Sequence, residues 1–421
     1  MTNHYEQADV VGADDFDPFS AATRARAPKA LAELARRAPV HHYRGAFDFF
    51  IQSDPDYITE VMFKDSDQWT SEFGVSPTDM PAEWQTRMLQ EGPAHGQIRM
   101  IIQRGFSPRQ LRRLAVAVER IVEDLLDAMS ARREASGDFF TLFAMPLPAR
   151  LMCVMLGTPE RDHLFYKDWA DRFFYMMNNQ PGLTSEDYLQ QTREIGEKLF
   201  RLIGERKATL EAAGLDRDVA RIGHELPDDF LSRFLCETID GEHLPEVEIL
   251  SLMTAIILGG NETTMNLIGN LLWRLLEDRT RWERVCADPA LIEVAIEESL
   301  RLDPPTLGMV RSARHDIVFD HLTIPAGAKT FYNVSAVNRD PDRWEQPDEF
   351  RLDRPLGRLK HHASFCGGTR FCLGASLARM EVKLAFERIL ARFPKMRIAG
   401  EAKIAPGFNV WGKTELPVRW D

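Results

Sequence analysis

The 421-residue sequence predicts a mainly α-helical fold with a minor β region, and three observations support this prediction. Apolar residues recur at helical spacing over long stretches, above all at 97–135 and 245–277. Short apolar runs broken by Gly and Pro, which are typical of strands, gather at 310–333. Because the sequence contains no repeat, no low-complexity tract and no obvious linker, we expect residues 1–421 to form a single domain.

The other predicted elements follow in chain order. The beginning of the chain combines a helical segment at 28–37 with a strand-like run at 47–51. Further helical patterns cover 147–156, 163–177, 185–213, 291–302 and 374–392. An irregular stretch rich in Pro and Asp spans 338–358, and short β segments are expected near Ile404 and Leu416.

Composition excludes several classes of protein. With 52 Lys+Arg against 64 Asp+Glu, the net charge of -12 argues against a general binder of nucleic acid or anionic membranes. The N-terminal residues are polar and acidic, and the most apolar stretch, 250–258, is too short to span a bilayer. The five Cys residues are scattered and odd in number, which favours reduced thiols. We therefore expect a cytoplasmic enzyme.

The most informative segment is 364–374, which reads SFCGGTRFCLG. Cys372 lies in a Gly-rich loop just before a predicted helix, so backbone N–H groups and the positive end of that helix point at its sulfur. Both effects favour a thiolate, the form that binds a metal or acts as a nucleophile. An inert thiol is the usual state of a lone Cys, but this combination of residues arises by chance in roughly one chain in ten thousand.

This segment resembles the haem-binding signature of the cytochrome P450 superfamily, in its soluble bacterial form. The matching residues are Phe365, Gly368, Arg370, Cys372 and Gly374. The resemblance implies the cytochrome P450 fold and haem b (iron protoporphyrin IX), with Cys372 as the ligand of the iron and Phe365 and Gly374 beside the cofactor. Cys366 departs from the pattern, which usually has Gly or another small or polar residue at this position, and its effect is left open.

The predicted helix 245–277 contains Gly259 and Gly260, and each Gly costs about 1 kcal/mol relative to Ala inside a helix. Close packing against another helix is one reason for such residues. A small-residue groove that holds a diatomic ligand beside a hydroxyl and a carboxylate is another. The resemblance implies the second reason: Thr263 holds dioxygen, Glu262 relays protons, and Gly259 borders the cofactor.

Charged residues on two other predicted helices can be interpreted in the same way. Glu298 and Arg301 share one helix face, as do His95 and Arg99, and such pairs are usually solvated and weak. Glu297 could also reach Arg301 at a spacing of four residues. The resemblance instead implies an interior structural network and a set of contacts to the haem propionates. The network comprises Glu298, Arg301 and Arg354, and the propionate contacts are His95, Arg99, Arg311 and Arg370.

Apolar residues are expected to shape the substrate pocket, although core packing is the commoner role of each one taken alone. The predicted pocket residues are Ala255, Leu258, Leu307, Met309, Val310 and Val410. As a set they suggest a small apolar organic substrate, such as a terpenoid or an aromatic compound. The sequence does not choose among these.

The chain ends at residue 421 without a recognisable flavin or iron–sulfur module after Cys372, so we expect electrons to come from a separate partner. The resemblance implies use of O2, an iron–sulfur ferredoxin and an NAD(P)H-dependent ferredoxin reductase, with no nucleic acid and no membrane. Basic residues near the predicted haem site could steer such docking despite the net charge. They are Arg104, Arg109, Arg112, Arg113, Lys360 and His361.

Three alternatives remain at this point. The first is a peroxide-dependent peroxygenase on the same fold, against which the Glu262–Thr263 pair counts. The second is a non-catalytic haem or gas sensor. The third is an enzyme that uses Cys372 as a nucleophile with a His base such as His362.

Overall fold

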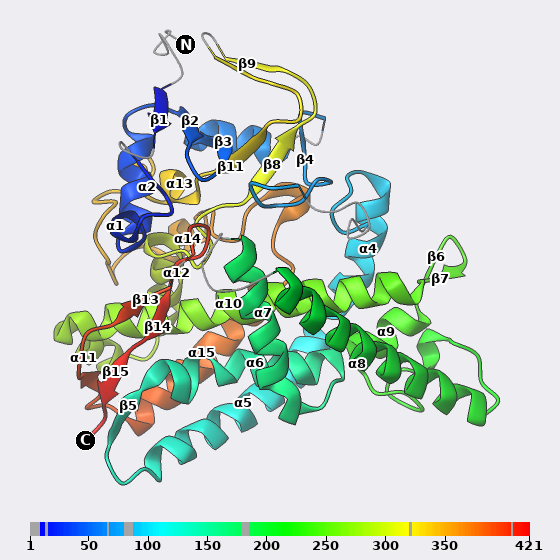
Figure 1. Ribbon diagram of the computed structural model, residues 1–421. Helices are drawn as coiled ribbons and strands as arrows, with labels where there is room; N and C mark the ends of the chain where they lie inside the picture. The colour runs from blue at the N-terminus through cyan, green and yellow to red at the C-terminus, as the bar shows by residue number, and fades with distance from the viewer. Residues whose placement is uncertain are drawn as a thin grey trace.

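The computed structural model describes residues 9–12, 16–64, 67–79, 87–177, 185–319, 322–405 and 407–421. One long helix, α10 (Glu246–Glu277), crosses the middle of the molecule (Figure 1). In that view the strands of the main sheet lie above α10, and the helices α5 and α15 lie below it. The mainly α-helical fold with a minor β region is therefore confirmed.

Several helices begin at a proline, whose fixed φ suits the first helical turn, where its missing N–H is not needed. In the described part of the chain, no helix combines the length and the apolar character needed to span a bilayer. In addition to α10, the helices are α1 (Ala21–Arg24), α2 (Ala27–Ala35), α3 (Pro55–Tyr57), α4 (Pro93–Arg104), α5 (Pro108–Ser130), α6 (Pro146–Leu156), α7 (His163–Met177), α8 (Ser185–Ala212), α9 (Phe230–Cys236), α11 (Arg279–Ala287), α12 (Leu291–Leu302), α13 (Val334–Asn338), α14 (Leu356–Leu359) and α15 (Ala375–Arg392).

The single helical pattern predicted at 97–135 was wrong in one respect, because it is two helices, α4 and α5. Pro108 starts α5 and keeps Ser107 in an extended conformation with ψ 158°, which ends the first helix before it. Gly105 closes α4, and a Cβ there would lie 2.3 Å from the ring of Phe230. Both helices bury one face in the same core, so the apolar periodicity runs across the break.

The main sheet has six strands in the order β1-β2-β3-β11-β8-β4. β1 pairs with β2, and β3 with β11, in parallel; the other neighbours are antiparallel. Thr330 of β11 lies opposite Arg311 of β8, which is the strand next to the edge strand β4. The strands are β1 (Asp9–Gly12), β2 (Val40–Arg44), β3 (Asp48–Gln52), β4 (Trp69–Thr70), β8 (Val310–Ala313) and β11 (Lys329–Tyr332).

Smaller strand pairs complete the β structure. A three-stranded sheet has the order β12-β15-β5, and the hairpins β6-β7, β9-β10 and β13-β14 stand apart from it. These strands are β5 (Ser136–Asp138), β6 (Thr238–Ile239), β7 (Glu242–His243), β9 (Ile317–Phe319), β10 (Leu322–Ile324), β12 (Arg397–Ile398), β13 (Lys403–Ile404), β14 (Lys413–Glu415) and β15 (Pro417–Arg419).

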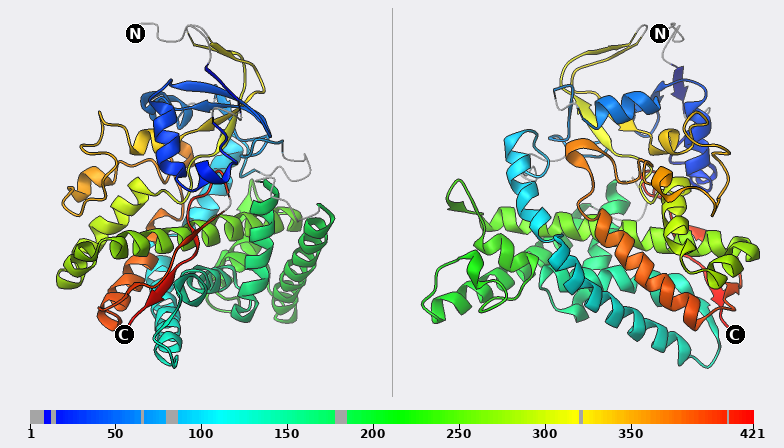
Figure 2. Two further views of the ribbon diagram at one scale, coloured as in Figure 1. Left: turned by 60° about the vertical axis from the view of Figure 1, so that its left-hand side comes forward. Right: turned by 180° about the vertical axis from the view of Figure 1, so that it is seen from behind.

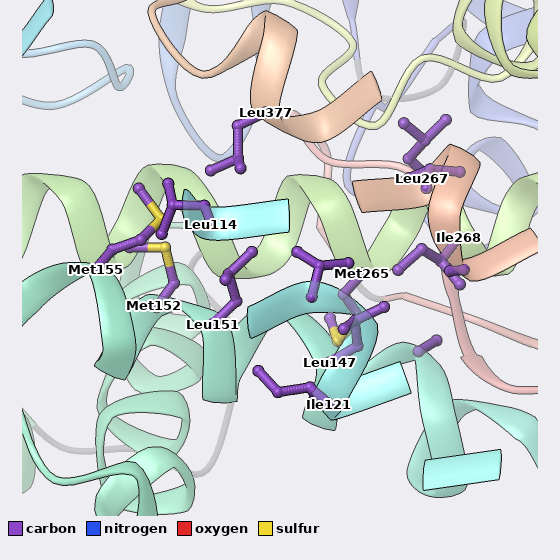
Figure 3. Packing of buried hydrophobic residues seen from close by; sticks show 14 of the residues in the cluster. Leu114, Ile121, Leu147, Leu151, Met152, Met155, Met265, Leu267, Ile268 and Leu377 are labelled. Carbon is purple, nitrogen blue, oxygen red and sulfur yellow. The ribbon is translucent and has the colours of Figure 1, made fainter. Parts of the chain in front are cut away.

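The largest apolar core joins α5, α6, α10 and α15. Figure 3 shows Leu114 and Ile121 of α5, Met152 of α6 and Leu377 of α15 around α10. Seen from behind, α15 runs alongside α5 below α10 (Figure 2, right). This close packing positions α10, which carries Thr263, relative to α15, which follows Cys372.

Candidate active site

A cavity of about 350 Å³ lies where α10, α4 and β8 meet the loop 365–374 that precedes α15. Its volume is within the range of small-molecule and cofactor sites. Most of its wall is apolar, and a few polar and charged side chains reach it from distant parts of the chain. This combination is typical of a site that binds an organic group and orients it.

Cys372 lies on one wall of the cavity, to which its side chain is exposed. Its backbone N–H donates to the carbonyl of Phe365 over 2.9 Å, which closes the loop on itself. Gly368 has a φ of 57°, and a Cβ there would lie 2.1 Å from the carbonyl oxygen of Phe63. Only Gly allows this close approach, and the loop therefore presents the sulfur to the cavity.

The backbone around the sulfur does not by itself produce a thiolate. Burial raises the pKa of Cys372 to about 11, although the N–H groups of Gly374 and Ala375 and the charge of Arg99 lower it in part. The backbone N–H groups at the start of the helix therefore favour the thiolate, as expected, but burial of the sulfur has the larger effect on its pKa. A metal cation bound at the sulfur would deprotonate it.

Cys366, at the position that departs from the family pattern, has a φ of 57°. This left-handed conformation favours Gly and costs other residues roughly 1–2 kcal/mol. The Cys366 sulfur lies 3.2 Å from the hydroxyl of Tyr332, within hydrogen-bonding distance, and both side chains line the cavity. The Cys366 thiol thus has a side-chain hydrogen-bond partner in the β region.

Four basic side chains from three regions of the chain converge on the cavity: His95, Arg99, Arg311 and Arg370. His95 is buried, and burial together with the charges of Arg370, Arg99 and Arg311 lowers its pKa to about 4. The predicted propionate residues are therefore close enough to influence one another. The three arginines concentrate positive charge at this wall, whereas His95 is neutral near pH 7.

Most of this charge has no acidic partner. Among the described residues, neither Arg99 nor Arg311 forms an ion pair with a carboxylate. Arg99 donates to the carbonyl of Phe371 over 2.7 Å, and Arg311 donates to the carbonyl of Met62. Arg370 is paired with Glu91 over 2.8 Å, but its buried Nε lacks a partner in the described structure. These donors fit an organic group that carries carboxylates.

The wall contributed by α10 is made of small residues. Ala255, Gly259 and Thr263 lie one turn apart and line the cavity. The Thr263 hydroxyl donates to the carbonyl of Gly259 over 2.7 Å. Apart from its chain neighbours and the backbone of α10 itself, no described atom lies within 4 Å of the position that a Cβ at Gly259 would take. Gly260 packs against Met152, whose sulfur would lie 2.4 Å from such a Cβ. The two glycines therefore serve different purposes: Gly259 leaves space in the cavity, and Gly260 allows α10 to pack closely against α6.

Glu262 is buried and is directed toward α7, not toward the cavity. Its Oε2 lies 3.4 Å from the ammonium of Lys167, which also pairs with the partly exposed Asp171. Burial raises the pKa of Glu262 above its usual range, against the lowering effect of Lys167. The two acids raise the pKa of Lys167, although burial alone would lower it.

Three of the predicted pocket residues, Ala255, Met309 and Val310, line the cavity, and three do not. Leu307 and Val410 are buried near the bridge between Thr306 and Val410, and Leu307 belongs to a separate apolar cluster with Trp411. Leu258 packs against the main core because it lies on another face of α10. Their assignment to the pocket was wrong, since local sequence does not tell which face of an apolar segment meets a cavity.

The predicted interior network is present. Glu298 accepts two hydrogen bonds of 2.8 Å from Arg301 and one of 3.0 Å from Arg354. Glu298 and Arg301 have no exposed surface, and Arg301 also donates to the carbonyls of Asn338 and Pro347. This network joins α12 to the irregular stretch 338–358.

Sequence reasoning missed other residues near the site. Lys167 lies 95 positions from Glu262, a separation for which no local spacing gives a signal. Glu297 was considered as a partner of Arg301, but it binds His362 and Arg379. Because His362 also accepts a hydrogen bond from the Ser364 N–H, both of its ring nitrogens are occupied. His362 is therefore not available as a base for Cys372.

Comparison with known proteins gives consistent results. The family model described as Cytochrome P450 matches residues 39–403. The polyketide biosynthesis cytochrome P450 PksS of Bacillus subtilis is 30% identical over 327 residues, which cover 77% of this chain and 74% of that protein. The erythromycin C-12 hydroxylase of Saccharopolyspora erythraea is 30% identical over 398 residues, which cover 92% of this chain and 93% of that protein.

Solved structures share the fold. The structure of CYP109E1 from Bacillus megaterium in complex with corticosterone has a TM-score of 0.78 and 25% sequence identity. The match covers 95% of this chain and 99% of that one. The structure of PksS has a TM-score of 0.82 and 25% identity and covers 96% of this chain and 100% of that one.

Proposed function

The chain belongs to the cytochrome P450 family and is a monooxygenase, and on this premise we propose that it hydroxylates an apolar organic substrate with O2, haem b and electrons from a ferredoxin. The observation that carries this proposal is the wall of the cavity where a sulfur, Cys372, and unpaired cationic groups lie together. Haem requires such a wall, because it brings an iron and two carboxylates to the same site.

The donor set fits haem b. Cys372 would bind the iron, and His95, Arg99, Arg311 and Arg370 would hold the propionates. Phe365 and Gly374 would contact the porphyrin on the side of the sulfur, and Gly259 would do so from α10. When bound, the haem supplies the redox chemistry that activates dioxygen.

Thr263 is the residue of α10 that we assign to dioxygen. Its hydroxyl proton is engaged by the carbonyl of Gly259 over 2.7 Å, so the oxygen of the hydroxyl is left to accept a hydrogen bond from a ligand or a water in the cavity. The open space at Gly259 leaves room for that ligand. Thr263 would therefore orient a small ligand and the water beside it.

Glu262 is the residue that we assign to proton transfer, together with Lys167 and Asp171. The side chain of Asp171 is 39% exposed, whereas those of Lys167 and Glu262 are 9% and 11% exposed, so the three form a path from solvent to α10. Because burial raises its pKa, the Glu262 carboxyl can hold a proton at its oxygen. A turn of this side chain away from Lys167 would bring that proton toward Thr263.

The substrate proposed is a neutral apolar molecule such as a terpenoid or an aromatic compound. In the described wall near α10 and β8, the lining residues include Val75, Ala255, Ile256, Met309 and Val310, and none of these carries a charge. The names of the relatives mention polyketide biosynthesis and erythromycin, and the CYP109E1 structure contains corticosterone. Larger apolar substrates of these classes therefore belong in the same test panel.

Electrons would come from an iron–sulfur ferredoxin and its NAD(P)H-dependent reductase. Arg109 and Arg112 are exposed at the start of α5 and form no ion pair with any described residue, and Lys360 and His361 are also exposed. The start of α5 and the loop before α15 lie on the face seen from behind (Figure 2, right). Unpaired positive charge on this face would attract an acidic partner despite the overall negative charge.

The decisive experiment is the absorption spectrum of the reduced, carbon monoxide-treated protein. We expect the strongly red-shifted band of thiolate ligation, its loss in Cys372→Ser, and its retention in Cys286→Ser, a variant in α11 outside the cavity. A haem-containing wild-type protein without this band would overturn the proposal. Titration with the apolar panel, followed by product analysis with a surrogate ferredoxin system, then identifies the substrate class.

The same assay separates the rival functions. Turnover with peroxide but none with reductant and O2 would indicate a peroxygenase. Haem that binds ligands without any turnover would indicate a sensor. Purification without haem would return Cys372 to the role of a nucleophile, for which His362 is not available as a base.

A further inference from the structure

Two adjacent glutamates of α12 face different parts of the protein. Glu298 binds Arg301 and Arg354, whereas Glu297 binds Arg379 and His362. Successive residues of a helix point about 100° apart, so one carboxylate reaches the irregular stretch and the other reaches the segments beside Cys372. The network of Glu297 is therefore separate from the structural network of Glu298.

Glu297 is held by charged and neutral donors from both sides of the Cys372 loop. Arg379, on α15 after the loop, donates to both of its oxygens over 2.5 and 2.9 Å. His362, before the loop, donates through Nε2 over 3.1 Å. Glu297 is 3% exposed and His362 is 6% exposed, so these are buried, charge-assisted contacts.

The contacts continue into the loop. His362 accepts a hydrogen bond from the Ser364 N–H at Nδ1 over 3.1 Å, which requires the proton of the neutral ring to be on Nε2, facing Glu297. The guanidinium of Arg379 lies 4.5 Å from the centre of the Phe365 ring. The carbonyl of Phe365 accepts the hydrogen bond from the N–H of Cys372.

We infer that Glu297 is a positioning residue for the haem ligand: by holding His362 and Arg379, it fixes the loop at both ends and orients the sulfur of Cys372 toward the iron. This inference rests on the proposed function, because it assigns a role to the same sulfur. Glu297 does not touch the cavity, so its effect passes through Ser364 and Phe365.

The variant Glu297→Gln tests this chain of contacts with little change of shape. A Gln amide would place an N–H₂ group against either Arg379 or the Nε2–H of His362, where two donors would meet. If His362 moved its proton to Nδ1 in response, the conflict would pass to the Ser364 N–H. The carboxamide therefore disturbs the loop even if the two helices stay packed.

Glu293→Gln is the matched control. Glu293 also lies on α12 and pairs with Lys383 of α15, so it joins the same two helices, but both side chains are more than 40% exposed and neither lines the cavity. Glu293→Gln therefore removes an ion pair between the same two helices, but this pair makes no contact with the loop.

The measurements are the carbon monoxide spectrum of the reduced holoprotein and the rate of haem transfer to a scavenging apoprotein. We expect Glu297→Gln to convert much of the red-shifted band to the shorter-wavelength band of a haem without thiolate, and to lose haem on the order of 10-fold faster. Glu293→Gln should match the wild type in both, and Glu297→Asp should restore part of the red-shifted band.

A folded Glu297→Gln holoprotein with the wild-type spectrum and the wild-type rate of haem loss overturns the inference and leaves the proposed function intact. A wild-type holoprotein without the red-shifted band overturns both. If Glu297→Gln does not fold, His362→Leu removes one end of the network and should show the same spectral change. A normal spectrum in His362→Leu, or the failure of both variants to fold, assigns Glu297 a purely structural role.

Discussion

The two sides of the cavity are built in different ways. The sulfur side, residues 362–374 with their partners on α12 and α15, is held by buried carboxylates, guanidiniums and an imidazole from distant parts of the chain. The substrate side, formed by residues 255–264 of α10 and by residues 309 and 310 at the start of β8, presents mostly small or flexible apolar residues to the cavity. Glu262, the one charged residue in this stretch of α10, does not line the cavity and is turned toward Lys167.

This difference matches the role that we propose for each side. A metal ligand must be held in one geometry, and several buried ionic contacts that share one carboxylate achieve this because each restricts the others. A substrate wall must fit an organic skeleton, for which Met and Gly leave adaptable space. We therefore expect substitutions on the sulfur side to change stability and haem binding, and substitutions on the substrate side to change turnover.

The largest effect is expected for Glu298→Gln on the sulfur side. The change leaves the buried charges of Arg301 and Arg354 without their carboxylate, which typically costs about 3–5 kcal/mol. We expect the free energy of unfolding, measured by urea denaturation, to fall by that amount. Glu293→Gln should change it by less than about 1 kcal/mol, because its ion pair is exposed. An equal loss in both variants would contradict the distinction between buried and surface contacts.

On the substrate side, Glu262→Gln should lower the turnover number by roughly 100-fold, because the amide cannot hold and release a proton as the carboxyl does. The haem content and the red-shifted carbon monoxide band should stay at wild-type levels, since Glu262 does not line the cavity. Steady-state assays with the ferredoxin system and NAD(P)H measure the change. A wild-type turnover number in Glu262→Gln would show that Glu262 does not transfer the proton. Loss of haem from this variant would contradict the expectation that substitutions on the substrate side leave haem binding unchanged.

The smallest effect concerns acid stability on the sulfur side. Although burial raises the pKa of Glu297, hydrogen bonds from Arg379 and His362 outweigh it and hold that pKa at about 2. The unfolded chain has the ordinary value of about 4.3, so it binds more protons in this range. The contribution of the ionised Glu297 to the free energy of unfolding is therefore complete above about pH 4.3 and is lost as the pH falls toward 2.

The free energy of unfolding, measured at a series of pH values from neutral to acid, tests this direction of change. Between about pH 4.3 and 2, the wild type should lose more stability than Glu297→Gln, which lacks the titrating carboxyl. Glu293→Gln should follow the wild-type curve. Parallel curves for the wild type and Glu297→Gln would show that this carboxylate gains nothing from its partners.

The elements that local patterns dictate were predicted well. α12 spans Leu291–Leu302 as its apolar period indicates, and α7, α8, α10 and α15 lie within a residue or two of the predicted bounds. The break at Pro108 between α4 and α5 was missed because both helices bury their apolar faces in the same core, so the apolar period continues across the break. β1, β2 and the short helices α9 and α13 were not predicted, because a few residues give no measurable period.

The site was predicted where its residues lie close together in the sequence and missed where they do not. Cys372, Thr263 and the pair Glu298–Arg301 follow from short motifs, and the structure places the first two at one cavity. Lys167 and Arg379 find their acidic partners 95 and 82 positions away. Periodicity rules for helices and strands relate residues only a few positions apart, so they could not predict these ion pairs.

The sequence by itself determined which groups we propose to be reactive. A sulfur in a Gly-rich loop before a helix, and a hydroxyl beside glycines inside a helix, are local arrangements of neighbouring residues. Which face of an apolar segment meets the cavity, and which carboxylate holds which cation, was decided only in the folded chain. Leu307 and Val410 are buried in the core and do not line the cavity. Glu297 and Glu298 bind different cations. Both results depend on the elements that pack against each residue in the folded chain.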